Sequence, residues 1–107
     1  MGDPAGDTDG GDDGADDLTP LEAAIAAVML SLEPGDVVTY GEVAEEAGYP
    51  GRARAVGRFL KHHDGYPWWR VVNSVGRLVP NNEARQAELL RAEGVRVTDG
   101  RIRMRAR

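Results

Sequence analysis

Cysteine is absent from this chain of 107 residues, and its absence removes several kinds of chemistry. Without a thiol there is no disulfide, no thiolate zinc site and no cysteine nucleophile. Histidine is nearly as scarce, because the only two, His62 and His63, are adjacent. Neighbouring side chains on a helix point about 100° apart, so this pair makes a poor metal site. We therefore expect no metal, no cofactor and no enzymatic activity.

Long apolar runs are lacking as well. No stretch approaches the roughly 20 residues that a helix needs to span a bilayer. The N-terminal residues are acidic where a secretory or transit signal would be basic. We expect a cytoplasmic protein with no membrane association.

Basic residues are missing from the first half of the chain. Residues 1–20 hold seven Asp among Gly, Ala and Pro and cannot form a core. We expect residues 1–17 to be a disordered acidic tail and residues 18–107 to be one domain. Residues 51–107 carry all 13 basic groups against five acidic ones. This excess predicts either a basic face for a polyanion or an Arg-rich solvated surface.

Two capping boxes predict where helices begin. Residues 19–22 (Thr-Pro-Leu-Glu) form one, with Pro at the first helical position, and apolar residues then recur at helical spacing to residue 32. Residues 39–42 (Thr-Tyr-Gly-Glu) form the other and predict a helix over residues 40 to about 47. A turn at residues 48–51 precedes a third periodic stretch, residues 52 to about 62. The last two helices read as a helix-turn-helix.

The predicted third helix has two different faces. At about 100° per residue, one arc is apolar and is predicted to be buried: Ala55, Val56, Phe59 and Leu60. The opposite face sets three cations around one glycine: Arg54, Gly57, Arg58 and Lys61. A glycine on an exposed helix face lets another backbone approach closely. Such a face suits a DNA groove with phosphates on both sides, although an ordinary solvated basic face is the alternative.

Both tryptophans, Trp68 and Trp69, lie in the segment of residues 67–72 (Pro-Trp-Trp-Arg-Val-Val). The segment looks extended, so we predict that the two indoles point to opposite sides. An indole suits a pocket that accepts a planar, partly polar ring by stacking. The alternative is that the pair closes a small core.

The next segment predicts a turn and a fourth helix. Residues 70–79 read as two short extended pieces joined by a hairpin or a sharp loop. Asn82 is a candidate cap for a helix over residues 83–93 that ends at Gly94. The residues predicted to face inward are Ala84, Ala87 and Leu90.

Residues 95–104 predict a hairpin with a two-residue turn, Asp99-Gly100. In this register Val97 lies opposite Ile102 and Val95 opposite Met104. Arg96 then lies opposite Arg103, which is unfavourable unless an anion or a carboxylate neutralises the pair. The predicted fold class is mainly α with a small β hairpin, a winged helix-turn-helix. Its wing either contacts phosphate or is merely solvated.

Three segments together resemble the DNA-binding domain of the O6-alkylguanine-DNA alkyltransferases: residues 39–42, residues 52–57 (Arg-Ala-Arg-Ala-Val-Gly) and residues 67–77. The resemblance covers residues 20 to about 97. The family's active-site motif reads Pro-Cys-His-Arg-Val, with the alkyl-accepting Cys second and its base, His, third. Here Trp68 and Trp69 stand at those positions. Replacement of the Cys by Trp marks the alkyltransferase-like proteins, which resemble the repair enzyme but cannot accept an alkyl group.

The resemblance implies roles for individual residues. Arg54 matches the arginine finger that enters the duplex from the minor groove and fills the gap left by a flipped nucleotide. Tyr40 matches the tyrosine that presses on the 3′ phosphate and helps rotate the base outward. The implied DNA contacts are Tyr40, Arg52, Arg54, Gly57, Arg58 and Lys61. The implied lesion pocket consists of Tyr40, Trp68, Trp69, Val71, Asn73 and Ser74.

The function implied is that of a non-enzymatic sensor that binds O6-alkylguanine in double-stranded DNA, flips the base and flags it for nucleotide excision repair proteins. We expect a monomer that is nucleoid-associated when bound to DNA. Two other classes stay open. A winged-helix transcription regulator would read the major groove with polar side chains, although residues 52–55 contain no Asn or Gln. A pure protein-interaction module would show no DNA affinity at low salt.

Overall fold

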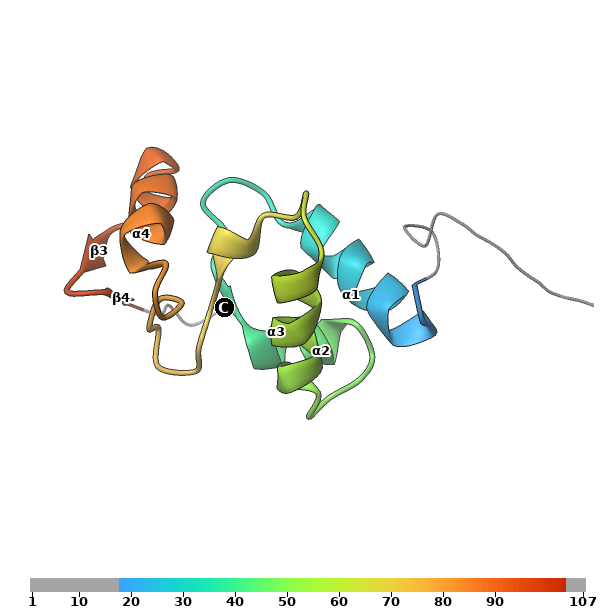
Figure 1. The fold of residues 1–107 in the computed structure, drawn as a ribbon. Helices are drawn as coiled ribbons and strands as arrows, with labels where there is room; N and C mark the ends of the chain where they lie inside the picture. The colour runs from blue at the N-terminus through green and yellow to red at the C-terminus, as the bar shows by residue number, and fades with distance from the viewer. Residues whose placement is uncertain (1–17, 104–107) are drawn as a thin grey trace, which may run out of the picture.

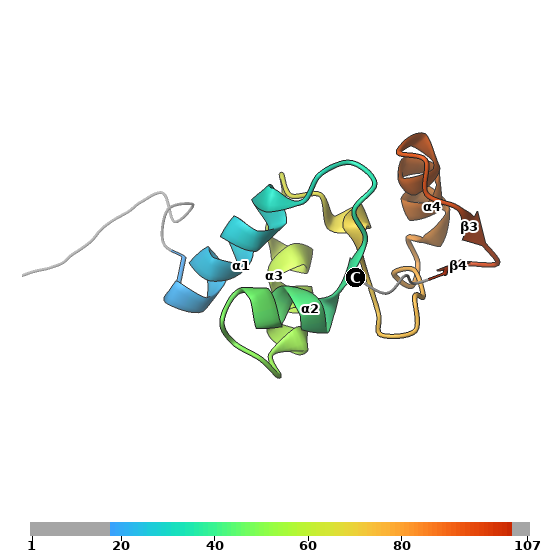
Figure 2. The same cartoon turned by 180° about the vertical axis from the view of Figure 1, so that it is seen from behind.

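The computed structural model describes residues 18–103. The predicted acidic tail of residues 1–17 therefore lies outside the described residues, as does Met104, the predicted partner of Val95. The elements follow in this order: α1 (Pro20–Ser31), β1 (Val38–Thr39), α2 (Tyr40–Glu46), α3 (Ala53–His62), the 3-10 helix η3 (Trp68–Arg70), β2 (Val71–Val72), α4 (Glu83–Ala92), β3 (Val97–Thr98) and β4 (Arg101–Ile102). Figure 1 shows α1, α2 and α3 together on one side, with α4 and the β3–β4 hairpin on the other; Figure 2 shows the same division from behind. No helix in this part of the chain is long and apolar enough to cross a membrane.

Both predicted capping boxes are confirmed. The Thr19 hydroxyl accepts from the Glu22 amide at 3.1 Å, and the Glu22 carboxylate accepts from the Thr19 amide at 3.0 Å. Thr39 and Glu42 repeat this exchange at 3.0 and 2.8 Å. The reciprocal bonds satisfy amide groups that a helix start leaves without partners, so each helix begins at a defined residue.

The apolar side chains form two clusters. The first joins α1, α2 and α3 and includes Ile25, Met29, Val43, Val56 and Phe59. The second lies under α4 and the hairpin: Val72, Leu78, Ala87, Leu90, Val97 and Ile102. Strand β2 connects them, because Val71 belongs to the first cluster and Val72 to the second. It pairs with β1 in parallel, with Val38 beside Val71 and Thr39 beside Val72.

The hairpin forms in the predicted register. Val97 pairs with Ile102 and Thr98 with Arg101, in antiparallel strands. The turn residues Asp99 and Gly100 have φ angles of 56° and 72°, as a tight two-residue hairpin turn requires at both central positions. The observed fold is therefore mainly helical, with a helix-turn-helix (α2 and α3) and a small hairpin, as predicted.

The prediction that residues 67–70 are extended is wrong, because Trp68, Trp69 and Arg70 form a 3-10 turn. The Arg70 amide donates to the Pro67 carbonyl at 3.0 Å. The side chains of Trp69 and Arg70 both reach Glu93. Adjacent side chains of a strand point to opposite faces, so only a helical turn brings both to one carboxylate.

Two predicted details of the fourth helix are also wrong. Ala84 is exposed, and the fully buried Gln86 takes a place on the inner face with Ala87 and Leu90. At 100° per residue, Ala84 lies roughly 115° from the middle of that face. Asn82 stands at the N-cap position, but its side chain makes no capping hydrogen bond.

Of the two alternatives for residues 70–79, the structure has the sharp loop. The Asn73 carboxamide oxygen accepts from the amides of Val75 at 3.0 Å and Arg77 at 2.8 Å. The side chain thus closes the loop on itself, as Asn does in turns. The strand before the loop pairs with β1, and Arg77 after it forms a bridge with Arg101.

Candidate nucleic-acid interface and lesion pocket

The outer face of α3 carries exposed cations. Arg54, Arg58 and Lys61 are exposed along two turns of the helix, and Arg52 is exposed at its N-cap without making a side-chain cap bond. The ion pairs found within residues 18–103 are Arg70–Glu93 and Arg85–Glu88, so no described carboxylate neutralises this face. A helix surface with this charge attracts a phosphate backbone.

Tyr40 lies against the middle of this face. It is the first residue of α2, and a Cβ atom added at Gly57 would lie 3.9 Å from Tyr40 Cε1. The phenol ring therefore covers Gly57, which is half-buried rather than fully exposed as the helical pattern predicted. Burial raises the pKa of Tyr40, so its hydroxyl stays neutral at physiological pH and can donate a hydrogen bond to a phosphate oxygen.

Both tryptophans line a cavity of about 550 Å³. Its walls come from the end of α1, the end of α3, the loop that follows, and η3, and they include Met29, Leu60, His63, Tyr66, Trp68 and Trp69. The two indoles meet edge to face, with ring centres 6.2 Å apart and planes at 87°. The cavity is open to solvent, and the indoles and the Tyr66 ring give it flat aromatic walls on which a planar ring can stack.

The other predicted pocket residues lie elsewhere. Tyr40, Val71, Asn73 and Ser74 are not among the residues that line this cavity. Val71 is fully buried, and its carbonyl accepts from Gln86 Nε2 at 3.0 Å. Ser74 borders a second hollow of about 1300 Å³ beside the C-terminal hairpin. A lesion pocket made of all six predicted residues stays a prediction.

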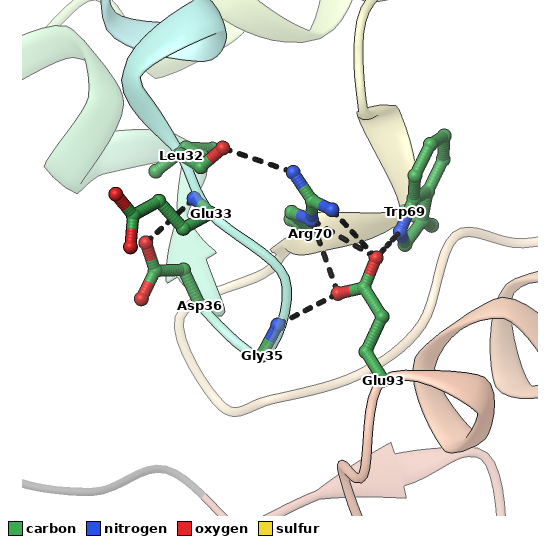
Figure 3. A network of polar contacts seen from close by, with 7 residues as sticks. All are labelled: Leu32, Glu33, Gly35, Asp36, Trp69, Arg70 and Glu93. Atoms are coloured by element: carbon green, nitrogen blue, oxygen red, sulfur yellow. Dashed lines mark hydrogen bonds and ion pairs between the residues drawn. The ribbon is translucent and has the colours of Figure 1, made fainter.

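A polar network holds the tryptophan segment in place (Figure 3). Glu93, at the end of α4, accepts from Trp69 Nε1 at 2.8 Å, from Arg70 Nη2 at 2.7 Å and from the Gly35 amide at 2.8 Å. Arg70 Nη1 donates to the Leu32 carbonyl at 2.9 Å, and the guanidinium carbon lies 5.3 Å from the centre of the Trp69 ring. One carboxylate therefore joins η3, the loop after α1 and the end of α4.

The network is charged and largely closed to solvent. The side chains of Arg70 and Glu93 are 11% and 12% exposed. The pKa of Glu93 is lowered to about 2. The hydrogen bond from Arg70 is the largest cause, and the bonds from Gly35 and Trp69 contribute less. Glu93 is thus ionised at neutral pH, and an indole N–H does not exchange a proton with it. The contact orients Trp69 and performs no acid–base chemistry.

Gln86 holds the same segment from a second position on α4. It is fully buried, its Nε2 donates to the carbonyls of Trp69 and Val71 at 3.0 Å each, and its Oε1 accepts from the Val79 amide at 2.7 Å. Sequence reasoning missed both Gln86 and Glu93. No local signal pointed to either residue: at 100° per residue Gln86 lies about 100° from the middle of the face predicted from Ala84, Ala87 and Leu90, and Glu93 follows the last residue of α4.

A metal site has no support in the part of the chain described: no group of three or more metal-binding side chains is found among residues 18–103.

The fold and the basic face of α3 define a helix-turn-helix protein of the DNA-binding class. Residues 20–95 match the family model of the 6-O-methylguanine DNA methyltransferase, DNA binding domain, and the chain belongs to this family.

Two relatives are similar in sequence to this chain. The chain is 44% identical over 87 residues to the DNA base-flipping protein of Vibrio parahaemolyticus, an alignment that covers 76% of this chain and 87% of that protein. It is 41% identical over 76 residues to alkyltransferase-like protein 1 of Schizosaccharomyces pombe, covering 64% of this chain and 70% of that protein. The resemblance to alkyltransferase-like proteins is therefore confirmed.

A solved structure has a similar fold. The chain resembles the crystal structure of S. pombe Atl1 in complex with damaged DNA containing O6-carboxymethylguanine, with a TM-score of 0.67 and 35% sequence identity. The match covers 73% of this chain and 79% of that chain. The predicted fold class is confirmed by this likeness.

Proposed function

We propose that this chain is a non-enzymatic sensor of O6-alkylguanine in duplex DNA. It binds from the minor groove, flips the modified base into the tryptophan-lined cavity and flags it for nucleotide excision repair proteins. On this proposal it acts as a monomer in the cytoplasm and is nucleoid-associated when bound. The observation that carries the proposal is the contact of Tyr40 with Gly57 at the centre of the basic face, in a chain of this family with Trp68 and Trp69 at the motif positions.

The geometry supports base extrusion in energetic terms. Removing a base from the stack costs a few kcal/mol. An inserted side chain that fills the gap offsets part of this cost, and Arg54 is an exposed cation near the start of α3. Stacking of the extruded base on an indole offsets about 1 to 3 kcal/mol more. A pocket that binds without a nucleophile would leave the alkylated base chemically unchanged.

Equilibrium binding to matched duplexes tests the proposal. The duplexes are identical except for one O6-methylguanine in place of guanine, and each pair is made in two unrelated sequence contexts. We expect tighter binding to the modified duplex in both contexts, with the O6-methylguanine recovered intact by mass spectrometry. Preference for one context irrespective of the lesion would favour a transcription regulator. No binding at low salt would favour a protein-interaction module.

A further inference from the structure

Two arginines face each other where the loop after β2 meets the hairpin. Arg77 forms an antiparallel bridge with Arg101 of β4, whose other neighbour is Thr98 of β3. The flanking hydrogen bonds run from the Leu78 amide to the Gly100 carbonyl at 3.0 Å and from the Ile102 amide to the Gly76 carbonyl at 2.9 Å. The two arginines therefore occupy a non-hydrogen-bonded pair, the narrow kind, with both side chains on the same face.

Alternation along the strands places more arginines on this face. Val97 and Ile102 are buried on one side of the hairpin, whereas Thr98 and Arg101 are exposed on the other. Arg96 and Arg103 flank the two strands, are also exposed and border the same hollow as Thr98 and Arg101. We call the resulting surface the arginine face: Arg77, Arg96, Arg101 and Arg103. It extends beyond residue 95, where the family match ends.

No described carboxylate forms an ion pair with the arginine face, although Asp36 and Glu93 border the same hollow as Arg96, Arg101 and Arg103. The ion pairs of residues 18–103 involve Arg70 and Arg85 only, and the nearest acidic residue in sequence, Asp99, is exposed in the turn. Like charges directly opposite each other on a sheet destabilise it. An anion bound between them removes the repulsion, and the planar fork of a guanidinium matches the oxygens of a phosphate.

We propose that the arginine face is a second DNA-contacting surface, which binds backbone phosphates beyond those that α3 contacts. The inference rests on the proposed function, since the duplex is the same one. Charge complementarity selects this occupant, because a duplex presents regularly spaced phosphates to a row of arginines. Phosphate contacts carry no sequence information. The face therefore adds affinity and leaves the preference for the lesion unchanged.

The slope of log K against log salt concentration measures this contribution, because each lost phosphate contact reduces the slope by about 0.9. We expect Arg101→Gln to reduce the slope by about 0.9 and the double variant Arg77→Gln with Arg101→Gln by about 1.8. Both effects are the same on modified and unmodified duplexes. The matched control is Arg85→Gln, which removes one exposed charge from α4 in the same part of the molecule, where Glu88 already pairs with it at 2.8 Å. It leaves the slope unchanged.

Two further variants keep the result interpretable. Arg101→Lys retains the charge and should retain the slope. The melting temperature of free Arg101→Gln should equal or exceed that of the wild type, because the repulsion with Arg77 is gone. Slopes of the glutamine variants equal to that of Arg85→Gln would overturn the inference. If the wild type binds modified and unmodified duplexes equally well, the proposed function is overturned instead. The slopes measured on unmodified DNA would still decide whether the arginine face contacts phosphates.

Discussion

Helices α1 and α2 begin at capping boxes whose two members are three residues apart, whereas η3, β2 and α4 are joined by side chains 15 to 24 residues apart. The part formed by α1, α2 and α3 therefore starts its first two helices through contacts between residues close in sequence, and the outer face of α3 is exposed. The C-terminal part depends on long-range polar contacts to hold the tryptophans. The comparison shows that the helices that carry the basic face start at local contacts, whereas the tryptophan segment depends on contacts that reach from the end of α4 to the loop after α1.

The largest expected effect comes from breaking the network around Glu93. Arg70→Met removes the guanidinium but keeps its apolar stem, and it leaves a largely buried carboxylate without its ion-pair partner. We expect the free energy of unfolding, measured by urea denaturation, to fall by about 3 to 5 kcal/mol. Arg85→Met breaks an exposed pair, with side chains 62% and 71% exposed, and should change stability by less than about 1 kcal/mol. Equal effects of the two variants would remove the distinction between a structural network and a surface pair.

The two tryptophans should separate stability from recognition. Trp69 packs against the second apolar cluster and donates to Glu93, so Trp69→Ala should lower the free energy of unfolding by about 3 kcal/mol. Both indoles line the cavity, but only Trp69 packs against the second cluster, so Trp68→Ala should reduce discrimination between O6-alkylguanine and guanine by about 1 to 3 kcal/mol with little loss of stability. Melting curves and lesion affinities of both variants check this, and the reverse pattern would exchange the two roles.

Acid should weaken the C-terminal part through Glu93. Its pKa is lowered to about 2 from the ordinary value of 4.5, so its contribution is fully present above pH 4.5 and is lost as the pH falls toward 2. With allowance for solvent screening, we expect the wild type to exceed Glu93→Gln in free energy of unfolding by about 1 to 3 kcal/mol at pH 6. The difference should shrink steadily below pH 4.5. A difference that is independent of pH between 6 and 2.5 would contradict this assignment.

The smallest effect is expected at Gly57, and its sign differs between stability and binding. A Cβ there would make an ordinary contact with the Tyr40 ring at 3.9 Å, so Gly57→Ala should raise the free energy of unfolding by about 0.5 to 1 kcal/mol through helix propensity. On the proposed function, the added methyl group would fill the space beside the Tyr40 ring at the centre of the basic face and weaken binding. Thermal melting and a binding titration measure the two effects. Unchanged DNA affinity would show that no backbone approaches this glycine.

Sequence reasoning succeeded where the physical cause is local. Thr19 and Thr39 cap helices through residues three positions away, and the faces of α3 follow from 100° per residue. It failed at Trp69 and Arg70 because their conformation is set by Glu93, which no local pattern connects to them. For the site, the exposed cations of α3 could be predicted. The contact of Tyr40 with Gly57 depends on how α2 packs on α3, so only the family resemblance pointed to Tyr40.

Base extrusion itself tests the central claim most directly. A duplex with 2-aminopurine as the target base reports unstacking by fluorescence, and the wild type should raise that fluorescence on binding. Arg54→Ala should abolish the rise without changing the melting temperature, because Arg54 is exposed on α3, while the control Arg85→Ala should keep it. The same rise with Arg54→Ala as with the wild type would contradict the account.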